Sequence, residues 1–163
     1  AHHGHSLVSI AVSHTFHSAG MFAFTIPLGK LADRFGRSRV MFPGVAVSLI
    51  GAAFVAFTGA LWSVTLGTFL VGIGWAAANV SATALLADLF PSEKRGRAIG
   101  INDSFAGAVM VGAALVTGPL IEFYGLPVAG LTAVMMAIPP LAMLTFNRAR
   151  SDMPSGESAP FDA

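Results

Sequence analysis

The sequence of 163 residues contains no cysteine and very little charge. Without cysteine, the chain can form neither a disulfide framework nor a metal site with thiolate ligands. Charged residues make up 10% of the chain, whereas an ordinary soluble domain carries about 25%. So few charges could not cover the surface of a soluble fold. The net charge of +1 does not indicate a nucleic-acid partner either.

Long apolar stretches take up most of the chain, of which 55% is hydrophobic. A bilayer core of ~30 Å requires roughly 20 mostly apolar residues in one helix. Five stretches meet this requirement: residues 7–29, 40–58, 61–86, 98–120 and 126–146. They predict an all-α fold over residues 1–150, a polytopic bundle of transmembrane helices in a lipid bilayer. Residues 151–163 are rich in Ser, Pro, Gly and acids, which predicts a disordered tail.

The basic residues occupy alternate connections between the predicted spans. All nine follow the first, third or fifth span: Lys30, Arg34, Arg37, Arg39, Lys94, Arg95, Arg97, Arg148 and Arg150. Alternate connections lie on the same side of a membrane, and the side rich in Lys and Arg faces the cytoplasm. The sequence therefore predicts a cytoplasmic C-terminus and an N-terminus on the outer side.

Small residues recur every four positions in the second and third spans. The two sets are Gly44, Ser48 and Ala52, and Gly74, Ala78 and Ala82. Such faces let membrane helices approach closely, so we expect tight packing of these two helices.

The first basic connection has glycines, an acid and arginines at fixed offsets. Residues 29–39 read GKLADRFGRSR. Gly29 and Gly36 permit a sharp turn and close helix approach. Asp33 can cap or face the positive end of a neighbouring helix.

Arg34 and Arg37 in this connection can pair with carboxylates at the same membrane surface. The second basic connection, residues 88–98, reads DLFPSEKRGRA and lies on the same side. Its candidate partner residues are Asp88, Glu93, Arg95 and Arg97. We expect Asp88 or Glu93 to supply the carboxylate.

Both connections resemble those of the major facilitator superfamily. The family's signature loop, G-x-L-A-D-R-x-G-R-[KR]-x, is matched at Gly29, Leu31, Ala32, Asp33, Arg34, Gly36 and Arg37. Ser38 stands where Lys or Arg is usual, and Arg39 follows it. The second connection is similar to the P-x-x-x-R-G-x-A core that joins the fourth and fifth, or tenth and eleventh, helices of that family.

The resemblance implies that the spans are helices eight to twelve, in the C-terminal six-helix half of a drug-exporter-like permease. The N-terminal half of the same family is the alternative. The resemblance further implies proton-coupled, alternating-access transport of a small solute or drug, by an antiporter or efflux protein of a bacterial inner membrane. The signature loop would then be a cytoplasmic latch. The implied partners are the missing N-terminal half, a small-molecule substrate and protons, with no cofactor.

Asp103 is an ionisable residue inside the fourth predicted span, where such groups are costly and often functional. It lies ~7–8 Å from the start of that span at 1.5 Å per residue. Asp103 and its neighbour Asn102 are therefore candidates for the substrate or proton pathway. The alternative is an acid stabilised by the positive end of its own helix.

Four further polar residues inside the spans are candidates for the same pathway. His14 and His17 share a helix face, as do Asn79 and Thr83. The histidines could bind substrate, carry protons or simply pack in the bundle. Two histidines alone do not make a metal site, so we predict none.

The sequence also allows comparison with a membrane scaffold, a metalloenzyme and a nucleotide-binding protein. A membrane scaffold or interaction protein without transport activity is a rival interpretation. An intramembrane metalloenzyme would need a motif such as H-E-x-x-H, and a nucleotide-binding protein a G-x-x-x-x-G-K-[ST] loop. The sequence contains neither, so we do not expect an enzyme.

Overall fold

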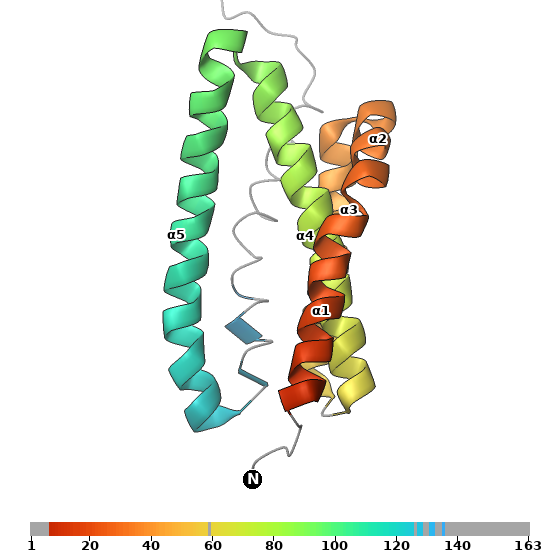
Figure 1. Ribbon diagram of the computed structural model, residues 1–163, viewed down its shortest axis with the longest axis vertical. Helices are drawn as coiled ribbons and strands as arrows, with labels where there is room; N and C mark the ends of the chain where they lie inside the picture. Colours follow the sequence, from red (N-terminus) through yellow and green to blue (C-terminus); the bar gives the residue numbers. More distant parts are fainter. Residues whose placement is uncertain (1–6, 59, 126, 129–130, 133–134, 136–163) are drawn as a thin grey trace, which may run out of the picture.

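The computed structural model describes residues 7–58, 60–125, 127–128, 131–132 and 135. Its helices are α1 (Leu7–Ala23), α2 (Thr25–Phe35), α3 (Arg37–Phe57), α4 (Leu61–Leu89) and α5 (Ser92–Tyr124). They run side by side as a bundle, with the short α2 at one end (Figure 1). The predicted all-α fold is confirmed for the part of the chain that the structure describes. Most of the fifth predicted span, and the whole tail 151–163, lie outside the described residues.

Three helices, α3, α4 and α5, are long and apolar enough to cross a membrane. The first predicted span, 7–29, is not continuous, because α1 ends at Ala23 and α2 begins at Thr25. Pro27 explains the break: it has no N–H, and its ring would clash with the carbonyl four residues earlier. In the first turn of α2 the same proline is tolerated. The hydroxyl of Thr25 donates to the carbonyl of Phe22 at 2.8 Å and satisfies one group freed by the break.

The first basic connection is mostly helical, which corrects its interpretation as a loop. Helix α2 continues to Phe35, only Gly36 is non-helical, and α3 begins at Arg37. Gly36 has φ of +99°, a conformation that residues with a Cβ rarely adopt. One residue in this conformation changes the direction of the chain, so α2 and α3 are joined without a loop of several residues. The second connection is also short, because α4 ends at Leu89 and α5 starts at Ser92.

Helix α4 packs against α1 and α3 through glycines. A methyl group added at Gly51 of α3 would lie 2.5 Å from the carbonyl oxygen of Gly67 in α4, so the two backbones touch. One added at Gly20 of α1 would lie 2.6 Å from the carbonyl oxygen of Phe69. Such approach is the main source of helix association in lipid, where helices gain little from burying apolar surface.

The predicted small-residue faces meet in this packing. A Cβ at Gly44 would clash with Ala77 and crowd the backbone of Gly74, and one at Gly74 would clash with Ser48. The expected close approach of the second and third spans is therefore confirmed at these positions.

Helix α5 is the exception. It contacts α4, but no contact with α1, α2 or α3 occurs among the described residues. None of its residues is buried, and Cβ atoms added at Gly96, Gly100 or Gly107 would meet nothing within 4 Å. In Figure 1, α5 stands apart from the α1–α3–α4 group.

We predict that Gly51→Ala destabilises the full-length protein that carries this chain, because the new methyl must push α3 and α4 apart. Overpacking of this kind costs about 1–3 kcal/mol. The matched control is Gly29→Ala in α2, where the same methyl makes an ordinary contact of 3.6 Å with Val80 of α4. Unfolding in mixed micelles, followed by circular dichroism, measures both; equal stability of the two variants would contradict the packing described here.

Candidate functional site

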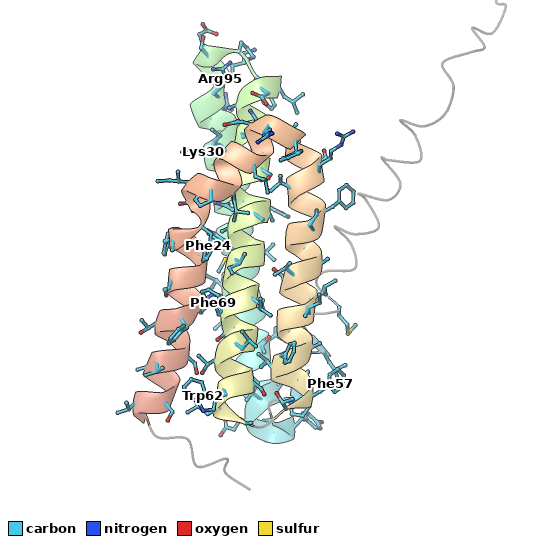
Figure 2. The ribbon with its side chains drawn as sticks, turned by 90° about the vertical axis from the view of Figure 1, so that its right-hand side faces the viewer. Phe24, Lys30, Phe57, Trp62, Phe69 and Arg95 are labelled. Atoms are coloured by element: carbon cyan, nitrogen blue, oxygen red, sulfur yellow. The ribbon has the colours of Figure 1, made fainter. Side chains whose placement is uncertain are left out.

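The basic residues that the structure describes gather toward one end of the bundle, which we call the basic end. Figure 2 shows Lys30 and Arg95 toward this end and Phe57 and Trp62 at the opposite end. Trp62 is 81% exposed, as expected for an aromatic residue at a membrane–water interface. The distribution agrees with the alternation of basic connections in the sequence.

An ion cluster, Asp33, Arg37 and Asp88, ties three helices together at the basic end. Arg37 opens α3, and its Nε donates to Oδ2 of Asp88, near the end of α4, at 3.1 Å. Its Nη1 donates to Oδ1 of Asp33, one turn earlier in α2. The side chain of Arg37 is 23% exposed, whereas the carboxylates are 68% and 57% exposed. One shielded guanidinium is therefore shared by two carboxylates that face outward.

The other signature residues lie around this cluster without joining it. The guanidinium of Arg34 lies over the ring of Phe35, 5.4 Å from its centre, in a cation–π contact. A methyl group at Gly29 would lie 3.6 Å from Val80, an ordinary contact, so the packing does not require glycine there. Of the two signature glycines, only Gly36 is demanded by its conformation.

Glu93 does not pair with an arginine of the first connection. Its carboxylate accepts a hydrogen bond from the hydroxyl of the adjacent Ser92 at 2.8 Å. Arg95 donates from Nε to the carbonyl of Phe90 at 2.9 Å, across the turn between α4 and α5. Asp88 is thus the partner that contacts Arg37, because it still belongs to α4, the helix against which α3 packs.

A seam of polar groups joins α1 and α4 within the bundle. The buried hydroxyls of Ser13 and Thr65 are 2.8 Å apart. The Thr68 hydroxyl reaches the carbonyl of Ser13 at 3.4 Å. Nδ1 of His17 lies 2.8 Å from the carbonyl oxygen of Thr68. Sequence reasoning missed Ser13, Thr65 and Thr68; the available signal was a pair of threonines three apart in a predicted span.

The contact with Thr68 orients the ring of His17. A carbonyl oxygen only accepts, so Nδ1 of His17 carries a hydrogen and donates it. The ring of His14, which is exposed, stacks on that of His17 with centres 6.3 Å apart. In the described segments, no group of three or more His, Cys, Asp or Glu could hold a metal ion.

The remaining pathway candidates lie elsewhere. Asn79 and Thr83 are half-buried on α4. On α5, the Asn102 amide donates to the Asp103 carboxylate at 3.2 Å, and Asp103 is exposed. Because α5 does not contact α1 among the described residues, the histidines and Asp103 are not brought together. The predicted pathway residues thus form separate groups on different helices.

Apolar helices long enough to span a bilayer, with basic residues gathered toward one end, define an integral membrane protein of the helical class. The sequence profile of the Major Facilitator Superfamily matches residues 1–161. The chain belongs to this family of membrane transporters, and the predicted resemblance is confirmed.

Three relatives illustrate the range of similar proteins. The riboflavin transporter RfnT of Brucella anthropi is 33% identical over 128 residues, covering 76% of this chain and 31% of that protein. The inner membrane transport protein YajR of Escherichia coli is 34% identical, with 71% and 24% covered. The multidrug resistance protein MdtL of Escherichia coli is 27% identical, with 82% and 36% covered. The chain thus spans about a quarter to a third of the length of these relatives.

Proposed function

We propose that this chain is part of a secondary transporter that moves a small organic solute across a bacterial inner membrane by alternating access. Membership of the family supports transport, and the named activities of the relatives include a vitamin transporter and a multidrug resistance protein. Since the chain spans only about a quarter to a third of the length of these relatives, transport needs further helices. We place residues 1–150 in the C-terminal six-helix half, with the N-terminal half as the partner.

The ion cluster Asp33–Arg37–Asp88 is the observation that carries this proposal. It lies where the positive-inside rule places the cytoplasm, and it connects the ends of α2, α3 and α4. Exposed ion pairs contribute only about 0–1 kcal/mol each. A latch of that strength holds one conformation and still opens during a cycle whose states differ by a few kcal/mol. We therefore assign it the role of a cytoplasmic latch.

We assign proton coupling and substrate contact to the polar residues inside the helices. The candidates are His14, His17, Asn79, Thr83, Asn102 and Asp103. A proton moving down the membrane potential supplies about 2.3 kcal/mol per 100 mV, enough to drive antiport of a drug-like solute. His17 contacts Thr68 through Nδ1, and Asp103 is exposed on α5, so both are side chains that such a proton could reach.

Asp33→Asn and Asp88→Asn should each reduce transport by about two- to fivefold, because each removes one carboxylate from a latch whose ion pairs contribute up to about 1 kcal/mol each. The full-length protein is reconstituted in proteoliposomes, with riboflavin and ethidium as probe solutes. Lys30→Gln is the matched control, since it removes an exposed charge from α2 outside the cluster. Insertion is checked by the yield of folded protein, and parent-like transport by Asp33→Asn would exclude the latch.

Asp103→Asn should abolish accumulation driven by a proton gradient but preserve exchange of solute between equal concentrations, because exchange needs no net proton movement. The same proteoliposomes, with and without an imposed pH gradient, measure both activities. Full proton-driven accumulation by Asp103→Asn would remove this residue from the coupling mechanism.

A further inference from the structure

A groove of about 690 Å³ lies between the end of α4 and the start of α5, at the basic end. Leu86 and Phe90 line it from the α4 side, and Lys94, Arg97, Ala98, Ile101, Asn102 and Phe105 line it from α5. Lys94, Arg97, Ile101 and Phe105 are three or four positions apart, so they share one face of the helix. The two cations stand at the outer end, and mostly apolar side chains, with the amide of Asn102 among them, follow toward the bilayer.

The groove carries positive charge without a compensating acid. No carboxylate lines it among the described residues. Glu93 accepts from Ser92 instead, and Arg95 is engaged with the carbonyl of Phe90. Asp103 follows Lys94 by nine residues, or two and a half helical turns, which places it on the opposite face of α5. Within the described part of the chain, Lys94 and Arg97 therefore offer two uncompensated charges to whatever occupies the groove.

We propose that this groove binds one anionic phospholipid, with its headgroup on Lys94 and Arg97 and an acyl chain along Ile101 and Phe105. The distance from Lys94 to Phe105 along the helix is about 16 Å at 1.5 Å per residue. One leaflet of a bilayer core of ~30 Å has about the same thickness. A soluble phosphate compound would use the two charges and leave the apolar part of the groove uncovered. The positive charge of the groove and its length along α5 therefore both fit a lipid.

Native mass spectrometry of the full-length protein tests this site, with phosphatidylglycerol and phosphatidylcholine of identical acyl chains as probes. Each basic residue beside an anionic lipid contributes a factor of about five. We expect the parent to prefer phosphatidylglycerol by roughly 10- to 30-fold, from two such residues. Lys94→Gln/Arg97→Gln should remove the preference. Ala98→Phe, which fills the groove without changing charge, should weaken binding of phosphatidylglycerol.

The matched control is Lys30→Gln/Arg39→Gln, which removes two exposed charges at the same end but outside the groove. It should keep the preference of the parent. An equal loss in this control would mean that the lipid responds to general surface charge, and the site would be rejected. No preference in the parent, or full binding by Ala98→Phe, would overturn the proposal as well. Circular dichroism confirms that each variant is folded.

Discussion

The structure depends on backbone contact between α4 and its neighbours α1 and α3. Helices in lipid gain little from covering apolar surface, so they associate where small residues let their backbones touch. Gly67 of α4 meets Gly51 of α3, and Gly72 of α4 meets the backbone of α1 at His17. The Ser13–Thr65 hydrogen bond forms because this approach brings the two hydroxyls within reach. The glycine contacts therefore determine which polar groups can meet.

The same packing determines the arrangement at the basic end. With α3 and α4 held together, the single residue Gly36 places Arg37 at the start of α3, next to Asp88 of α4. The cluster is weak in itself, but it stands on a closely packed group of helices. Helix α5 has open space around its glycines and no buried residue, so it lacks that kind of contact within the described chain.

Hydropathy and charge sufficed to predict the helical class and the start of α4 at Leu61, and the family was predicted from the resemblance of residues 29–39 and 88–98 to known motifs. They did not locate the break before Pro27, because the hydropathy of an apolar segment is the same whether its helix is straight or kinked. The helical state of residues 30–35 was missed for a related reason: charge suggested a loop, although charged residues at a helix end extend into water. Ser13 and Thr65 are 52 positions apart in the sequence, and their contact depends on how α1 and α4 are aligned along each other. A local sequence pattern does not contain that information. Glu93 and Asp88 looked equivalent in sequence and differ only in the helix to which each belongs.

The absence of cysteine makes one direct test simple, since an introduced pair is the only thiol pair in this part of the protein. The hydroxyls of Ser13 and Thr65 are 2.8 Å apart, so Ser13→Cys/Thr65→Cys should form a disulfide under mild oxidation in the full-length protein in native membranes. Ser13→Cys/Ser104→Cys, which joins α1 to α5, is the comparison. We predict that the first disulfide forms rapidly and that little of the second forms, as measured by mass spectrometry of the linked peptides. Cross-linking of the first pair no faster than the second would contradict the close packing of α1 on α4.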